Sequence, residues 1–235
     1  MVRVIAHRGA SAQAPENTVE AFGLARDLGA DWVELDARRT ADGGLAVHHD
    51  AALADGRMVM DLDLAALPDG LCDLASALVA CEGMSVNIEI KNWPDDPDFD
   101  PAESVAHGVV ATVQRHQRQE TVLISCFHRP TIDLVRELDP SIPTALLGFQ
   151  GPDGWDELVR GLADAGHRAV HPWYPMVQEE MVSKAHDAGL EVNVWTVNDS
   201  HHMADLVERG VDGICTDLPD VARKLLDRRF GVPSS

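Results

Sequence analysis

The sequence predicts an α/β protein folded as a single (β/α)8 TIM barrel, with a short hairpin decoration after the second strand. Short apolar runs alternate with amphipathic stretches along the whole chain, which is the pattern of parallel strands joined by helices. Eight such pairs can be counted, and 235 residues is close to the roughly 250 that one such barrel needs. No linker interrupts the alternation, so we expect one domain over residues 1–235.

The predicted strands are the short apolar runs. They cover residues 2–6, 32–36, 85–90, 121–126, 144–147, 169–171, 190–197 and 211–215. A further run at 45–48 is separated from residues 38–40 by the turn Asp42-Gly43-Gly44, so we expect it to form the hairpin.

The predicted helices are the stretches in which apolar residues recur at helical spacing. In the first of them Val19, Phe22, Ala25 and Leu28 follow this spacing, and Gly29 comes next as a stop signal. The helices cover residues 17–28, 71–81, 101–116, 130–138, 155–165, 177–188, 200–209 and 220–228.

Composition and charge exclude several classes of function. Apolar residues make up 45% and charged residues 25%, as in ordinary globular proteins. The net charge of −20 argues against nucleic acid or anionic lipid as a partner, and no apolar run approaches the roughly 20 residues of a membrane span. The four cysteines form no C-x-x-C pair and no signal peptide is visible, so we expect a cytoplasmic protein with reduced thiols. The oligomeric state is left open.

Acidic residues stand where two predicted strands end, which is where barrels of this kind carry their chemistry. Glu34 and Asp36 end one strand, and Glu89 ends the next core strand. Residues at i and i+2 of a strand share a face, so we expect all three carboxylates on one rim. Three like charges need compensation, and oxygen ligands suit a hard cation. The pattern favours one divalent cation, Mg²⁺ or Ca²⁺.

Basic residues occur at the same strand ends. Arg8 and Lys91 would add positive charge beside the metal, and together they describe an anion clamp, most naturally for phosphate. His7 and one of the pair His48-His49 are the candidate general acid and base. Any one of these residues alone is commonly structural, but their convergence on the ends of four strands favours function.

Seven motifs then occur in an order that is typical of one family. They are His7-Arg8-Gly9, Pro15-Glu16-Asn17-Thr18, Glu34-Leu35-Asp36, His49-Asp50, Glu89-Ile90-Lys91, Trp195-Thr196-Val197-Asn198 and Gly210-Val211-Asp212-Gly213. On these motifs the sequence resembles the glycerophosphodiester phosphodiesterases, in the compact bacterial form, from residue 4 to about residue 219. The resemblance implies a metal-dependent hydrolysis of glycerophosphodiesters to glycerol 3-phosphate and an alcohol, in lipid and glycerol metabolism. A small-molecule substrate is the implied partner.

The resemblance also implies residue roles, which agree with the reading from the strand ends. The metal ligands are Glu34, Asp36 and Glu89, the acid–base pair is His7 and His49, and the phosphate is held by Arg8 and Lys91. Of the two adjacent histidines His49 matches, because it directly precedes Asp50, and His48 is expected to point the other way. One histidine would deprotonate a glycerol hydroxyl that attacks phosphorus, and the other would protonate the departing alcohol, so that a cyclic phosphate forms.

Other residues carry weaker expectations. The resemblance places Glu16, and with it Asn17, beside the metal ligands, although Asn17 or Thr18 could equally cap the first helix. Trp195 is expected to be either core or an aromatic wall for the glycerol side. Asp217 is expected to be a helix cap or the ion-pair partner of a rim cation. Four histidines are expected in exposed loops or at helix starts without a role: His128, His171, His201 and His202.

Two segments bear on substrate choice. Only 38 residues separate Asp50 from Glu89, so we expect the cap insertion of the family to be reduced here, to about residues 51–70. The loop 92–100 holds four aspartates with Trp93 and Phe99. It is either a solvated loop or a surface that attracts a cationic head group such as choline, and we expect broad tolerance of the alcohol with a mild preference for cationic ones.

Alternatives remain. A lysophospholipase D or sphingomyelinase D-like activity would use the same residues, and an exposed aromatic rim would favour it, but only 5% of residues are aromatic. A metal-dependent amidohydrolase would need a His-x-His motif, and the sequence has none. A non-catalytic phosphate-binding protein would have lost a site residue, and none is missing.

Overall fold

The chain folds as a closed parallel barrel in the computed structural model, which describes residues 2–231. The barrel strands are β1 (Arg3–His7), β2 (Trp32–Arg39), β4 (Ser85–Ile90), β5 (Val122–Cys126), β6 (Thr144–Gly148), β7 (Ala169–Pro172), β8 (Glu191–Val194) and β9 (Gly213–Thr216). β1 pairs with β2 on one side and with β9 on the other, which closes the sheet. The predicted (β/α)8 barrel is therefore confirmed. Residue 1 and residues 232–235 of the predicted domain lie outside the described part.

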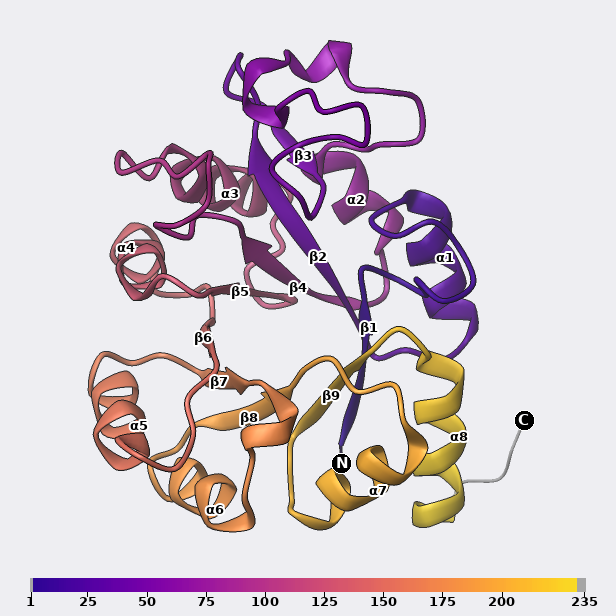
Figure 1. Ribbon diagram of the computed structural model, residues 1–235, viewed down its shortest axis with the longest axis vertical. Helices are drawn as coiled ribbons and strands as arrows, with labels where there is room; N and C mark the ends of the chain where they lie inside the picture. Colours follow the sequence, from indigo (N-terminus) through magenta and orange to yellow (C-terminus); the bar gives the residue numbers. More distant parts are fainter. Residues whose placement is uncertain (1, 232–235) are drawn as a thin grey trace.

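Eight helices surround the barrel, one after each barrel strand (Figure 1). They are α1 (Val19–Asp27), α2 (Leu74–Ala80), α3 (Ser104–Arg115), α4 (Arg129–Leu138), α5 (Trp155–Asp164), α6 (Glu179–Asp187), α7 (Ser200–Glu208) and α8 (Pro219–Phe230). All eight were expected, with ends that differ by a few residues. None of the helices in residues 2–231 is long and apolar enough to cross a membrane.

The main core lies between the barrel and the helices. Outward-facing side chains such as Val33, Leu35 and Ile88 are fully buried there, and Phe22 of α1 packs in the same cluster. Residues on the other face of the strands point to the barrel axis, where Leu123 of β5, Ala145 of β6 and Ala169 of β7 form a small apolar layer with the half-buried Trp32. The polar residues predicted at the strand ends therefore stand above an apolar floor.

The expected hairpin is formed by β2 and β3 (Leu45–Val47), with Gly43 at a positive φ in the turn. β2 continues to Arg39 rather than ending at Asp36, because its last residues pair antiparallel with β3. Residues 51–70 follow as a loop that contains the short 3-10 helices η1 (Val59–Asp61) and η2 (Leu64–Ala66), near the hairpin at the top of Figure 1. A third 3-10 helix, η3 (Tyr174–Met176), follows β7.

Candidate active site

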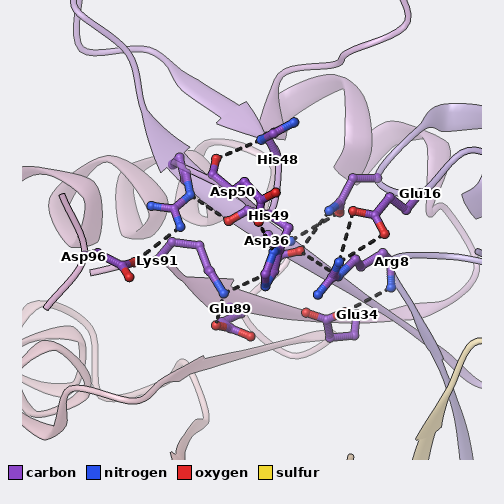
Figure 2. A network of polar contacts seen from close by, with 12 residues as sticks. Arg8, Glu16, Glu34, Asp36, His48, His49, Asp50, Glu89, Lys91 and Asp96 are labelled. Atoms are coloured by element: carbon purple, nitrogen blue, oxygen red, sulfur yellow. Dashed lines mark hydrogen bonds and ion pairs between the residues drawn. The ribbon is translucent and has the colours of Figure 1, made fainter. Parts of the chain in front are cut away.

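Three carboxylates meet at the carboxyl end of the barrel. Glu34 and Asp36 come from β2 and Glu89 from β4, with Asp36 directly opposite Glu89 in the strand register. One oxygen of each lies within 4.8 Å of the others. Glu34 and Asp36 are buried, whereas the side chain of Glu89 is 13% exposed. Figure 2 shows the three acids with the basic residues around them. The strands bring together all three acids singled out in the sequence.

The three carboxylates of the cluster carry more negative charge than Arg8 and Lys91 compensate. Burial, with the neighbouring Asp36 carboxylate, raises the pKa of Glu34 to about 8. Burial also disfavours the charged form of Asp36, but Lys91 and Arg8 outweigh it and hold the pKa of Asp36 below its usual range. Within residues 2–231, Asp36 Oδ1 is buried and has no hydrogen-bond partner. Hard oxygen donors with an unsatisfied buried atom fit a divalent cation.

Arg8 and Lys91 lie against the acids. The Arg8 backbone N–H donates to Glu34 Oε2 at 3.0 Å, and its Nε is 3.3 Å from Asp36 Oδ2. Lys91 Nζ is 2.7 Å from Glu89 Oε1 and 3.5 Å from Asp36 Oδ1. The two cations therefore stand beside the carboxylate cluster, where an anion could reach both.

Asn17 and Glu16 contact different partners. Asn17 is buried and donates from Nδ2 to Asp36 Oδ2 at 2.8 Å. The cap of α1 is Thr18, whose hydroxyl accepts from the Ala21 N–H, so Asn17 is free to orient the acid. Glu16 accepts from Arg8 Nη1 with both oxygens at 3.0 Å. Glu16 therefore orients the guanidinium rather than the carboxylates.

His7, at the end of β1, is held by a residue that directly follows the last strand, β9. Its Nδ1 lies 2.6 Å from Asp217 Oδ1, which also accepts from the Ser11 hydroxyl at 2.9 Å. Asn198 Nδ2 donates to the other Asp217 oxygen. Burial alone would lower the pKa of His7, but Asp217 and Glu34 outweigh it and raise that pKa. Burial would raise the pKa of Asp217, but the hydrogen bond with His7 brings it down to about 2.

The two adjacent histidines after β3 differ in direction. Figure 2 shows His49 turned toward the carboxylates and His48 turned away from them. His49 Nδ1 is 2.7 Å from Asp50 Oδ1, and His48 Nδ1 is 2.8 Å from the Asp50 backbone oxygen. In both His7 and His49 the contact through Nδ1 leaves Nε2 available for proton transfer. The structure thus places His7 and His49 beside the cluster as two separate imidazoles.

Arg38 is a contributor that the sequence did not single out. It follows Asp36 by two residues on β2, so it shares the inward face, and it is buried. Its guanidinium donates to the His49 backbone oxygen at 2.8 Å and to both oxygens of Asp98 at 2.7 Å. Arg38 therefore ties the His49 turn to the loop 92–100. The alternation of strand residues beyond Asp36 could have indicated its position, because residues 36 and 38 of one strand share a face.

The acids of that loop are engaged in structural contacts. Asp98 and Asp96 both pair with Arg38, the latter at 3.3 Å. Asp100 accepts from the Ser104 N–H at the start of α3, and Asp95 accepts from the Trp93 indole N–H. Two of the four carboxylates are thus paired with a guanidinium, whereas Asp95 and Asp100 accept hydrogen bonds from neutral N–H groups; attraction of a cationic head group stays a prediction.

Aromatic side chains line the rim opposite the hairpin. This aromatic rim consists of Trp93, Phe127, Phe149, Trp173, Tyr174 and Trp195, whose ring centroids lie 5.3–6.4 Å apart from neighbour to neighbour. Its members follow five different strands, β4 to β8, so no local pattern in the sequence indicates that they meet. Trp195 also donates to the His171 backbone oxygen at 2.7 Å. A groove of about 560 Å³ runs from His49 and Glu89 to Phe149.

The expectation that His171 lies in an exposed loop or at a helix start is wrong. This histidine lies inside the barrel, almost fully buried, because it shares the inward face of β7 with Ala169, two residues before it. Its Nε2 is 2.9 Å from Asn193 Nδ2. Burial, with the charge of Arg3, lowers the pKa of His171 to about 3. The other three histidines lie at helix starts as expected: His128 at α4, and His201 and His202 at α7.

Comparisons with known proteins agree with this geometry. The model of the Glycerophosphoryl diester phosphodiesterase family matches residues 7–221. The chain is 30% identical to a glycerophosphodiester phosphodiesterase of Caldanaerobacter subterraneus, covering 95% of this chain and 97% of that protein. A phosphodiesterase of Oleispira antarctica, solved in complex with the product sn-glycerol-3-phosphate, superimposes with a TM-score of 0.86 at 27% identity, covering 96% of each chain. A glycerophosphodiester phosphodiesterase of Parabacteroides distasonis gives 0.84 at 25% identity, covering 97% of this chain and 98% of that one.

Proposed function

Because the chain belongs to the glycerophosphoryl diester phosphodiesterase family, and so to the phosphoric diester hydrolases, we propose that it hydrolyses glycerophosphodiesters to glycerol 3-phosphate and an alcohol. The observation that carries the proposal is the cluster of Glu34, Asp36 and Glu89, flanked by two cations and two histidines. This set can neutralise a phosphodiester and move a proton on each side of it.

One divalent cation, Mg²⁺ or Ca²⁺, is part of the proposal. Glu34, Asp36 and Glu89 would hold it, and the buried Asp36 Oδ1, which has no hydrogen-bond partner within residues 2–231, supports this. When bound, such an ion polarises a phosphoryl oxygen and stabilises the charge that develops on it. Asn17 keeps Asp36 oriented through its amide.

Arg8 and Lys91 would bind the phosphate. Both pair with carboxylates at 2.7–3.5 Å, and guanidinium and ammonium groups have further N–H donors that an arriving phosphate can accept from. Charge placed in advance of the reaction is commonly the largest catalytic contribution. Trp195 would form the wall for the glycerol, next to His7 at the mouth of the barrel.

His7 and His49 would act as the acid–base pair. In the first step one imidazole takes the proton of a glycerol hydroxyl as its oxygen attacks phosphorus. The bond from phosphorus to the alcohol oxygen breaks, and that oxygen receives a proton from the other imidazole. A cyclic phosphate results, and water opens it with the two roles reversed, giving glycerol 3-phosphate. Asp217 and Asp50 keep each ring oriented through Nδ1.

The test is release of glycerol 3-phosphate from glycerophosphocholine, glycerophosphoethanolamine and glycerophosphoglycerol by the purified protein. We expect activity with Mg²⁺ or Ca²⁺ and loss of activity in excess chelator. No release from any of the three substrates with either metal would refute the proposal. We also propose that the enzyme works in the cytoplasm, where a reducing environment suits its four free cysteines.

A further inference from the structure

The groove beside His49 has a chemistry that the proposed reaction leaves unexplained. We propose that it holds a hydrocarbon chain carried by the alcohol that departs, so that preferred substrates are glycerophosphodiesters of alcohols bearing such a chain. This inference rests on the proposed function, because it names the substrate class of the same site.

The first support is the apolar character of the groove and its continuity with the catalytic residues. The groove is lined by His49, Glu89 and Lys91 of the candidate site. It is also lined by apolar side chains, among them Ala51, Ala52, Trp93, Pro97, Phe127 and Phe149. A bound chain would therefore begin at the phosphate and continue over apolar surface.

The second support is the exposure of the aromatic rim. Phe149 is 60% exposed, Trp93 41% and Trp173 38%, although such side chains are normally buried. Six of the eleven aromatic residues of the chain gather on this rim. Exposed apolar surface concentrated beside a catalytic centre is typical of a ligand-binding groove.

The positions of the two histidines decide which part of the substrate lies in the groove. The entering and leaving oxygens of a phosphoryl transfer lie on opposite sides of phosphorus, so acid and base must do so too. His7 borders a cavity of only about 30 Å³ at the barrel axis, together with Trp195. His49 borders the groove of about 560 Å³. The glycerol therefore lies with His7 and Trp195, and the alcohol lies with His49, whose Nε2 protonates its oxygen.

The partners of the acids along the groove favour a hydrocarbon chain over a cationic head group. A cation would be drawn most strongly to a carboxylate without a basic partner. Two aspartates line the groove: Asp50 contacts His49 at 2.7 Å, and Asp96 pairs with Arg38 at 3.3 Å. Asp98 behind it is buried against the same guanidinium. Asp96 and Asp98 thus share one guanidinium, while more than half of the residues that line the groove are apolar and offer contact to a hydrocarbon chain.

The experiment compares glycerophosphoethanol, glycerophosphobutanol and glycerophospho-octanol, below their micelle-forming concentrations and with Mg²⁺ present. Each fully buried methylene is worth up to about a fourfold gain, so we expect kcat/KM to rise at least about tenfold from the ethyl to the octyl ester. Phe149→Ala should reduce this octyl-to-ethyl ratio severalfold. Phe230→Ala, which removes a 49% exposed ring on α8, is the matched control and should leave the ratio unchanged.

Several outcomes would overturn the proposal. A kcat/KM that does not depend on chain length would do so, as would a Phe149→Ala ratio equal to that of the wild type. If chain length matters only for lysophosphatidylcholines, whose chain is on the glycerol, the assignment of sides is wrong and a lysophospholipase D activity fits instead. Binding to phosphatidylcholine vesicles that depends on Phe149, without a chain-length effect in solution, would assign the rim to a lipid surface.

A binding arm separates failure of the subsite from failure of the proposed function. Octyl phosphate and ethyl phosphate are titrated into the same protein with Mg²⁺ and followed by calorimetry. We expect the octyl ester to bind at least about tenfold more tightly, and Phe149→Ala to remove most of the difference. If this holds while no glycerophosphodiester is hydrolysed, the proposed reaction fails and the chain subsite stands. Equal affinities would reject the subsite even in an active enzyme.

Discussion

At the scale of single residues, the pair His48-His49 shows how direction decides role. The two imidazoles are neighbours in sequence, and both contact Asp50. Only His49 faces the carboxylates, while His48 points away (Figure 2). A residue type that is common on protein surfaces therefore gains a chemical role from the turn that follows β3.

We expect His49→Ala to lower kcat by about 10²–10⁴-fold, because proton transfer to the alcohol oxygen is lost. His48→Ala is the matched control and should lower it far less. Steady-state kinetics with glycerophosphoglycerol, alongside melting curves of both variants, check this. Equal losses in the two variants would show that the assignment of the pair is wrong.

Glu34 is the second residue with a consequence of its own, because it is buried beside two other carboxylates. We expect Glu34→Gln to abolish most activity and yet to stabilise the metal-free protein. The melting temperature should rise by about 2–4 °C for each kcal/mol of repulsion removed.

Calorimetry of chelator-treated protein, repeated with Mg²⁺ and with Ca²⁺, measures this effect. Added metal should raise the melting temperature of the wild type more than that of the variant. The exposed Glu82→Gln serves as control. If Glu34→Gln had a lower melting temperature than the wild type, and metal still raised that temperature fully, Glu34 would not belong to a cation-binding cluster.

At the scale of elements, the extension of β2 beyond the barrel supports the site from outside. Its residue Arg38 holds the His49 turn and the loop 92–100 together through Asp98. Both partners of this ion pair are buried, so each depends on the other for compensation of its charge.

We therefore expect Arg38→Met to lower the free energy of unfolding by about 3–5 kcal/mol, because Asp98 is left buried without a partner. Adding Asp98→Asn should recover part of the loss. Urea unfolding of the two single variants and the double variant gives the coupling. Arg57→Met is the control, since the pair of Arg57 with Asp55 is exposed and its loss should not be measurable. Additive single effects would mean that the two side chains act independently.

At the scale of the whole molecule, the barrel interior carries a neutral histidine. The pKa of His171 is lowered to about 3, whereas in the unfolded chain it is near 6.5. Below pH 6.5 the unfolded chain binds a proton that the folded protein does not. The contribution of His171 to the free energy of unfolding is therefore fully present above pH 6.5, and it is lost as the pH falls toward 3.

We expect this loss to reach about 1.4 kcal/mol per pH unit below 6.5. His171→Gln keeps an acceptor for Asn193 and should flatten the pH dependence of unfolding between pH 6.5 and 4.5. The exposed His107→Gln is the matched control. If both variants followed the wild-type curve, protonation of His171 would not be coupled to unfolding.

The sequence predicted what local patterns determine. Alternation of apolar runs predicted all eight strand–helix pairs, and i, i+2 spacing placed Glu34 and Asp36 on one face. It did not predict features that depend on distant segments meeting. The aromatic rim draws on residues 93 to 195, and the pair of Arg38 and Asp98 joins residues 60 positions apart. His171 was misplaced because the inward face of β7, which it shares with Ala169, is set by how the strands close into the barrel.

The closure of the barrel has a consequence for the order in which the protein is made. The first strand contributes His7, and its partner Asp217 lies 210 positions later, on the segment that closes the ring. A ribosome releases the three carboxylates and His49 long before it releases β9. Until that strand docks, β1 has an open edge and His7 lacks the carboxylate that orients it. Hydrolytic competence thus arrives with the last few dozen residues, so a prematurely terminated chain would be inert rather than a partly active enzyme.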